Sequence, residues 1–279
     1  MSQIKPTHKN QMVPFFFKDD MKSPPPVVLK FGTGILAEPG GCAIDLGQCK
    51  RFAKEISKLM KQGIPCILVS SGAIAAGVHV LGLEKRPADV SGKQACAAVG
   101  QPALMAAYAR CFGRYGITTA QLLLTHEDIF TEKRRKNAQE TLKRLLLSPD
   151  LIPIINENDS VATEELNLGD NDQLSAEVAI MMQARLLLLL TTSDGLMARA
   201  EDVVPKRIST VTNIQDILCH VTPEKGEHSR GGMTTKLKAV QSALSAGIET
   251  FIADGRQPKQ IEKVLAGKNV GTRFLVPEG

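Results

Sequence analysis

The chain has 279 residues, of which 43% are hydrophobic and 23% are charged, with a formal net charge of +5 at neutral pH. This length supports one large domain or two small ones, and the longest apolar run, Leu186 to Leu190, is too short to span a bilayer. The positive charge is mild, and no basic tail or aromatic-rich basic stripe indicates nucleic-acid binding. We therefore expect neither a nucleic acid nor a membrane as a partner.

The cysteines and the N-terminus indicate the compartment. Six cysteines stand at positions 42, 49, 66, 96, 111 and 219, without a CxxC pair or a Cys/His spacing for zinc. Cys66, Cys96 and Cys111 lie in apolar runs, so we expect buried free thiols, which fits a reducing cytosol. The apolar run at 13–17 is too short for a signal-peptide core. We therefore expect a cytoplasmic protein.

The chain divides into an arm and one folded domain. Residues 1–26 are largely polar and close with Pro24-Pro25-Pro26, which predicts a flexible N-terminal arm. Over residues 27–279, apolar strands alternate with amphipathic helices, so we predict an α/β fold with a mostly parallel sheet covered on both faces. In chain order we expect strand 27–31, helix 45–62, strand 65–70, a helix that follows 71–77, helix 94–115 opened or kinked at Pro102, strand 118–124, helix 134–147, strand 151–155, helix 174–184, strand 186–191, a hairpin insertion within 195–225, helix 233–246 and strand 250–253.

Two glycine-rich turns follow predicted strands, at the edge where ligands of such sheets bind. Lys30 ends the first strand and enters Gly32-Thr33-Gly34, where backbone N–H groups can approach a phosphate and the lysine supplies positive charge. Ser71 and Gly72 open a helix, whose unpaired N–H groups suit a carboxylate or a phosphate. Taken singly, the first is compatible with a plain strand-to-loop turn and the second with an ordinary serine N-cap.

A loop rich in carboxylates and asparagines follows strand 151–155. Its two clusters are Asn156-Glu157-Asn158-Asp159 and Gly169-Asp170-Asn171-Asp172. The spacing of an EF-hand calcium loop is not met, and a solvated acidic loop is the ordinary alternative. Interleaved Asn and Asp can instead hold both the ammonium and the carboxylate of an amino acid, because Asn donates and accepts. Asp159 could pair with the ammonium, and Asp172 could hold lysines that face a phosphate.

A fourth loop, from His228 to Lys236, contains a Gly231-Gly232 turn that opens a helix. A helix N-terminus beside a cationic side chain suits an anion, although a helix start with a surface lysine is the ordinary alternative. Together the four loops supply two lysines, two glycine-rich helix entries and a dense Asn/Asp loop. Phosphoryl transfer needs such parts, because its catalysis is mostly positioning and stabilisation of charge on the γ-phosphoryl oxygens.

Several long motifs then point to a known family: VSSGAIAAG (69–77), KQACAAVGQPALM (93–105), AQLLLTHED (120–128), PIINENDSVATEE (153–165), GDNDQLSA (169–176) and RGGMTTKLKA (230–239). On these motifs, nearly everything after the arm resembles the amino acid kinase family, and within it the branch that phosphorylates glutamate. The resemblance implies an αβα three-layer sandwich that transfers the γ-phosphoryl group of ATP to the γ-carboxylate of L-glutamate. This is the first step of proline biosynthesis, and Mg²⁺ is the expected metal.

The resemblance also assigns roles to residues. Lys30 and Lys236 would contact the transferring phosphate, and Asp172 would organise them. The residues expected to bind glutamate are Ser71, Gly72, Asp159 and Asn171. The residues expected along ATP are Lys30, Gly32, Thr191, Thr192, Arg230, Gly231, Gly232, Met233, Thr234, Thr235 and Lys236. No side chain is assigned to a metal. The resemblance further implies a homo-oligomer, a dimer or a tetramer, and feedback inhibition by proline.

Three positions depart from the family pattern. The usual K-x-G-S-S is here Lys30-Phe31-Gly32-Thr33-Gly34, so residue 34 lacks a hydroxyl group. The usual Thr-Asp pair is Thr191-Thr192, with Asp194 as a substitute two residues on. The usual GTGGM begins Ser229-Arg230, which adds a positive charge. These changes bear on nucleotide affinity more than on the reaction type. Many bacterial members also carry a C-terminal domain of the RNA-modifying-enzyme type, and we expect none here.

Three other interpretations stay open. One is a kinase of the same family that acts on aspartate or acetylglutamate, against which the two Asn/Asp clusters argue. Another is a non-catalytic relative that binds glutamate or proline and regulates a partner. The last is nucleic-acid binding, which rests on the basic charge balance alone.

Overall fold

The structure is a computed structural model that describes residues 23–38, 44–161, 171–198, 206–218 and 232–277. No helix within these ranges is long and apolar enough to cross a membrane. Most of the expected arm falls outside the described residues, and so do Gly169, Asp170, Arg230 and Gly231.

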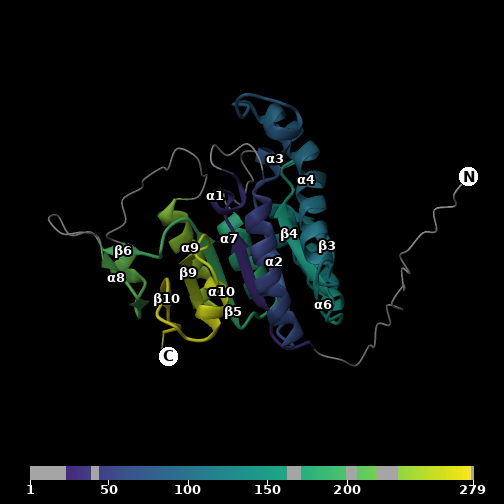
Figure 1. The fold of residues 1–279 in the computed structure, drawn as a ribbon. Coiled ribbons are helices and arrows are strands. Elements are labelled where there is room, and N and C mark those ends of the chain that lie inside the picture. The colour runs from purple at the N-terminus through teal and green to yellow at the C-terminus, as the bar shows by residue number, and fades with distance from the viewer. Residues whose placement is uncertain (1–22, 39–43, 162–170, 199–205, 219–231, 278–279) are drawn as a thin grey trace, which may run out of the picture.

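An eight-stranded sheet forms the centre of the fold (Figure 1). Its strands, in spatial order, are β3 (Thr118–Leu124), β4 (Leu151–Glu157), β2 (Cys66–Val69), β1 (Val27–Phe31), β5 (Leu186–Thr191), β9 (Thr250–Asp254), β10 (Thr272–Phe274) and β8 (Thr210–Val211). All neighbouring strands run parallel except β9 and β10, which are antiparallel. The prediction of a mostly parallel sheet is confirmed.

Helices cover both faces of this sheet, because its central strands are apolar on both sides. Successive residues of a strand point to opposite faces. Val27, Leu29 and Phe31 pack with side chains of α2 (Leu46–Lys61), α4 (Val90–Gly113) and α10 (Gln260–Leu265). Val28 packs on the other face with side chains of α6 (Glu132–Leu146), α7 (Asn171–Met181) and α9 (Met233–Ser245). The predicted αβα three-layer sandwich is confirmed.

Local sequence signals set several helix boundaries. The carboxylate of Asp45 caps α2 by accepting from the backbone N–H of Gln48 (3.0 Å). Asp89 caps α4 in the same way, through the N–H of Gly92 (2.7 Å). Thr125 and Asp128 form a capping box on the short helix α5 (His126–Phe130). These caps satisfy N–H groups that have no partner within their helix.

The structure differs from the predicted elements in several places. Helix α4 begins at Val90 rather than 94 because of the Asp89 cap, and it runs through Pro102 as one helix, so this proline does not open a segment. Helix α7 begins at Asn171 rather than 174, and β4 continues to Glu157 rather than 155. Helices α1 (Thr33–Leu36), α5, α8 (Gln215–Leu218) and α10 and strands β8 and β10 have no predicted counterpart. They are too short to show a hydrophobic period.

The region expected to hold a hairpin contains β6 (Met197–Ala198) and β7 (Lys206–Arg207), which pair antiparallel. The buried thiols are also confirmed, since Cys66, Cys96 and Cys111 are free and buried. Burial raises the pKa of Cys66 to about 12, so its thiol stays protonated at neutral pH.

Candidate active site

The parallel strands bring their carboxyl ends to one edge of the sheet, and the candidate residues gather there. Lys30 lies next to the end of β1, Ser71 follows β2, and Asn156 lies next to the end of β4. Val28 and Lys30 share one face of β1, because residues two apart in a strand point the same way. Lys30 therefore points into the layer that contains α7 and α9.

Lys30 and Lys236 meet on one buried carboxylate. The Nζ atom of Lys30 lies 2.5 Å from Oδ1 of Asp172, and the Nζ atom of Lys236 lies 3.1 Å from Oδ2. Asp172 is 0% exposed and both lysines are buried. Buried charges are stable only when paired, so Asp172 holds both ammonium groups in place. This lysine–aspartate cluster, Lys30, Asp172 and Lys236, carries one excess positive charge, which suits an anion.

Two helices begin beside the lysine–aspartate cluster. Asp172 lies in the first turn of α7, and Lys236 lies in the first turn of α9. Gly232 is the N-cap of α9 and offers no side chain to cap it, while its carbonyl oxygen accepts from the hydroxyl of Thr235 (2.9 Å). The partial positive charge of a helix N-terminus adds to that of the lysines. The sequence-predicted residues of β1, α7 and α9 are thus brought together.

A chain of amides adjoins the cluster. The Nδ2 atom of Asn171 donates to Oγ of Ser71 (2.9 Å) and to Oδ1 of Asn156 (3.1 Å). Nδ2 of Asn156 donates to Oε1 of Gln101 (2.9 Å), and Nε2 of Gln101 donates to Oε1 of Gln121 (2.9 Å). We call Gln121, Gln101, Asn156 and Asn171 the amide relay. It links α4, β3, β4 and α7 across the edge of the sheet.

The turn that carries Ser71 is held from two sides. Gly72 has φ 102°, a left-handed conformation that favours glycine, and it turns the chain from β2 into α3 (Ala73–Val80). The hydroxyl groups of Ser70 and Tyr108 lie 2.8 Å apart, which ties the turn to α4. Ser71 is thereby presented to Asn171 at the start of α3.

Helices α3 and α4 approach each other backbone to backbone, and Figure 1 shows them side by side at one end of the molecule. A Cβ atom added at Gly77 would lie 1.8 Å from the carbonyl oxygen of Cys96. One added at Gly100 would lie 1.8 Å from the carbonyl oxygen of Ala73. Only glycine fits at these two positions. The contact fixes residue 101 relative to the start of α3.

A cavity of about 270 Å³ lies against the amide relay. Its lining includes Gln101, Gln121, Glu157 and Asp159, and the first residue of α3, Ala73. Carboxylates and amides in one small cavity suit a compact polar ligand that carries a positive charge. Of the residues predicted to bind glutamate, Ser71 and Asn171 hydrogen-bond to each other, and Asp159 lies on the cavity wall.

The predicted nucleotide residues that the structure describes lie near the ends of β1 and β5 and at the start of α9. The carbonyl oxygen of Thr191 accepts from the N–H of Gly255 (2.8 Å), and that of Thr192 accepts from the guanidinium of Arg256. A Cβ atom at Gly34 would lie 3.1 Å from Cγ2 of Thr192. Two of the departures from the family pattern are therefore close to each other in space. The third, at Arg230, lies outside the described residues.

Asp194, the expected substitute for the missing aspartate of the Thr-Asp pair, has a different neighbour. One of its carboxylate oxygens lies 3.5 Å from Nε of Arg207. Asp194 itself is exposed.

Sequence reasoning did not single out Gln101 and Gln121, and it named Asn156 only as a member of the first Asn/Asp cluster, without a role of its own. A signal was present for Gln101 and Asn156, because Gln101 stands among apolar residues of a helix and Asn156 follows five apolar residues of a strand. Both are buried, at 7% and 1% exposure. A polar side chain in such a position requires a hydrogen-bond partner, which makes it a candidate for a network.

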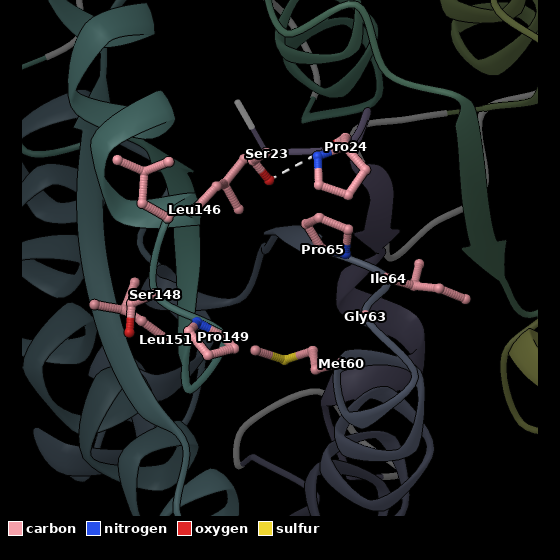
Figure 2. A pocket seen from close by; sticks show the side chains of 11 residues that line it. Ser23, Pro24, Met60, Gly63, Ile64, Pro65, Leu146, Ser148, Pro149 and Leu151 are labelled. Carbon is pink, nitrogen blue, oxygen red and sulfur yellow. Dashed lines mark hydrogen bonds between the residues drawn. The ribbon is translucent and has the colours of Figure 1, made fainter. Parts of the chain in front are cut away.

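A second hollow, of about 220 Å³, lies near the amino ends of β2 and β4 (Figure 2). Met60, Ile64, Leu146 and Leu151 contribute to its lining, which contains no charged side chain. A charged substrate would therefore find no side chain of opposite charge in this hollow. Within the described ranges, no group of three His, Cys, Asp or Glu side chains could hold a metal ion. The lysine–aspartate cluster likewise has its carboxylate between two cations, which does not fit a metal site.

Comparison with known proteins agrees with this geometry. The family model described as the amino acid kinase family matches residues 25–254. The chain is 44% identical to a glutamate 5-kinase of Gloeobacter violaceus, over 90% of this chain and 68% of the relative. It is 40% identical to a glutamate 5-kinase of Symbiobacterium thermophilum, over 89% of this chain and 95% of the relative.

Two solved structures share the fold. One is a UMP kinase from Bacillus anthracis, with a TM-score of 0.61 and 14% identity, covering 90% of this chain and 96% of that one. The other is a uridylate kinase from Archaeoglobus fulgidus, with a TM-score of 0.56 and 18% identity, covering 91% and 100%. At these identities the likeness concerns the fold alone. From the family match and the similar sequences together, this chain belongs to the amino acid kinase family.

Proposed function

We propose that this chain transfers the γ-phosphoryl group of ATP to the γ-carboxylate of L-glutamate and forms L-glutamyl 5-phosphate, the first step of proline biosynthesis. The observation that carries the proposal is the meeting of Lys30 and Lys236 on buried Asp172, one residue from Asn171 and the amide relay. A phosphate site and an amino-acid site thus adjoin each other. Relatives that are 40–44% identical and are named glutamate 5-kinase support the choice of glutamate.

In this reaction a carboxylate oxygen of glutamate forms a bond to the γ-phosphorus of ATP. The bond from that phosphorus to the β–γ bridging oxygen breaks, and ADP leaves. A glutamate side chain has a reference pKa of about 4.3, so the nucleophile is already ionised at neutral pH. No general base is needed, and none is assigned to this chain.

The difficulty is repulsion between the anionic carboxylate and the anionic triphosphate. Two like charges about 4 Å apart repel each other by several kcal/mol at intermediate dielectric. Lys30 and Lys236 oppose this repulsion, and their rigid pairing to Asp172 means that they need not reorganise during the reaction. The first turn of α9 adds its N–H groups on the phosphate side.

We assign the amino-acid end of the substrate to the cavity. Asp159 and Asn171 would hold the α-ammonium group, and Ser71 and Gly72 would lie near the carboxylate groups at the start of α3. ATP would lie along Gly32, Thr191, Thr192 and residues 230–236. Mg²⁺ would arrive bound to the phosphates of ATP, as part of the substrate, where it neutralises their charge.

A substrate panel tests the proposal. The chain is incubated with MgATP and L-glutamate, L-aspartate or N-acetyl-L-glutamate, and the acyl phosphate is trapped with hydroxylamine. We expect a hydroxamate with glutamate, and loss of that signal in Lys236→Ala. Product with aspartate or acetylglutamate but not glutamate would make the chain a different kinase of the family. Glutamate binding by calorimetry without turnover would make it a non-catalytic binder.

The remaining expectations are part of the same proposal. Residues 27–279 would form one kinase domain after an arm at 1–26, working in the cytoplasm as a dimer or tetramer and inhibited by proline. Light scattering measures the oligomeric state. Titration of proline into the hydroxamate assay measures inhibition. An unchanged rate at saturating proline would contradict the expected inhibition by proline.

A further inference from the structure

Gln101 is a buried polar side chain in a helix that packs on the central sheet. It is 7% exposed on α4, where its inward neighbours Leu104 and Tyr108 belong to an apolar core. An amide buried there is stable only with hydrogen bonds, and Gln101 has them on both sides, to Asn156 and to Gln121. No role in the proposed reaction is yet assigned to it.

A backbone group sets the direction of the amide relay. The N–H of Glu157 donates to the side chain of Asn156 at 3.0 Å, and a backbone N–H can only donate. The atom that it meets is therefore the oxygen of Asn156. The nitrogen of Asn156 then faces Gln101, whose Oε1 accepts from it at 2.9 Å. Without Gln101, this buried nitrogen would lose its acceptor and the amide of Asn156 would lose part of its support.

The orientation of the Asn156 amide also fixes that of Asn171. Its nitrogen donates to Ser71 and to the oxygen of Asn156, which uses both of its hydrogens. Its Oδ1 atom is buried and has no hydrogen-bond partner among the residues that the structure describes. A buried acceptor in this state fits a ligand that donates. An α-ammonium group is such a donor, whereas a carboxylate is not.

We propose that Gln101 is a positioning residue that, through Asn156, holds the Asn171 carbonyl oxygen toward the α-ammonium group of the substrate. It thereby contributes to selection of acids that carry a free amino group. This inference rests on the proposed function. It adds that recognition of the amino group depends on a residue of α4 that acts through two intervening residues, Asn156 and Asn171.

The test compares Gln101→Met with the unaltered chain, using L-glutamate and glutarate, which lacks the amino group. Methionine is close to glutamine in length but cannot accept strongly from Asn156. We expect the KM for glutamate to rise about tenfold, the energy of roughly one hydrogen bond in a buried site. The kcat and the KM for ATP should change by less than about twofold, and the preference for glutamate over glutarate should fall by about the same tenfold factor.

Gln62→Met is the matched control, because Gln62 is an exposed glutamine at the C-cap of α2, and it should leave the KM for glutamate and the glutarate preference unchanged. Gln121→Met tests the outer end of the relay. Gln121 is exposed, lines the cavity and reaches Asn156 through Gln101, so its loss should raise the KM for glutamate by less than about threefold. The double variant should be no worse than Gln101→Met alone, because both changes interrupt one relay. If Gln101→Met fails to fold, Gln101→Glu replaces it. That variant keeps an oxygen toward Asn156, and the KM should stay within about threefold of the original.

The outcomes separate this inference from the proposed function. If the unaltered chain does not phosphorylate glutamate, the proposed function fails. If it does, and Gln101→Met lowers kcat with an unchanged KM or leaves the glutarate preference intact, the positioning role fails alone. Additive effects of the Gln101 and Gln121 variants would also overturn the relay.

Discussion

The two halves of the candidate site differ in their chemistry. The proposed phosphate side is charged, with two lysines on one buried aspartate, whereas the proposed amino-acid side is a relay of neutral amides. Asn171 and Asp172 are neighbours in sequence, so the boundary between the halves falls within the first turn of α7. Fixed charges act on charge that develops during the reaction, and a neutral relay orients a group that is already bound. The first should govern turnover and the second affinity.

The largest effect should follow from removing the charge at the centre of the cluster. Asp172→Asn leaves two buried lysines without their anion, and breaking a buried pair costs about 3–5 kcal/mol of stability. Urea unfolding measures this loss. Adding Lys30→Met should recover part of it, because one unpaired cation disappears. A stability like that of the original chain would mean that the cluster is solvated rather than buried.

Removing one cation should lower kcat by a free energy almost as large as that stability loss. Lys236→Ala should lower kcat by about 10²–10³, or about 3–4 kcal/mol, since a fixed cationic donor at developing charge is lost. The KM for glutamate should change by less than about threefold. Lys238→Ala, on the exposed side of the same helix, is the control and should leave both constants unchanged. Equal losses in kcat and glutamate affinity would contradict the view that the lysines govern turnover and the amides govern affinity.

On the amide side, Asn171→Ala should show the opposite pattern. It removes a donor to Ser71 and Asn156 and the carbonyl oxygen assigned to the ammonium group. We expect the KM for glutamate to rise about 10- to 30-fold, or about 1.4–2 kcal/mol, with a smaller change in kcat. Steady-state kinetics with glutamate as the varied substrate measures it. A dominant fall in kcat would place Asn171 with the lysines instead.

The smallest effect should come from the nucleotide edge. Gly34→Ser would bring a Cβ atom to 3.1 Å from Cγ2 of Thr192, which must shift by a few tenths of an ångström. Both residues are exposed, so we expect a rise of about two- to fivefold in the KM for ATP, or less than about 1 kcal/mol. Combining it with Thr192→Gly should restore the original value. No recovery in the double variant would show that the two positions act independently.

Much of this could be predicted from the sequence, for identifiable reasons. The central strands are continuous apolar runs, and their alternation with helices predicts a parallel sheet covered on both faces. Strands β1, β3 and β5 have the predicted boundaries. Lys30 is notable in the sequence because it stands where an apolar strand ends, and Asp172 because it follows an Asn/Asp loop at the start of a helix. The carboxyl ends of parallel strands and the starts of the helices that follow them lie at the same edge of the sheet.

The amide relay could not be predicted in the same way. Gln101 and Asn156 are 55 positions apart, and no local pattern fixes which amide oxygen meets which nitrogen. That depends on the register of β4 against β3 and on the rotation of α4, which are set by packing. The start of α4 at Val90 is missed for a related reason, since a single cap at Asp89 outweighs the weak periodicity of the first turn.

The glycine pair between α3 and α4 has a consequence for how selectivity can change. A methyl group at Gly77 or Gly100 would clash with the backbone of the facing helix and force α3 and α4 apart. Ala73 of α3 and Gln101 of α4, which both line the cavity, would then move away from each other. The lysines are carried by β1 and α9 and would not be displaced by it. Such a substitution should therefore reduce the selectivity among acids and leave the lysines proposed to act on the phosphate in place. The distance between α3 and α4 would then determine which acid the cavity accepts.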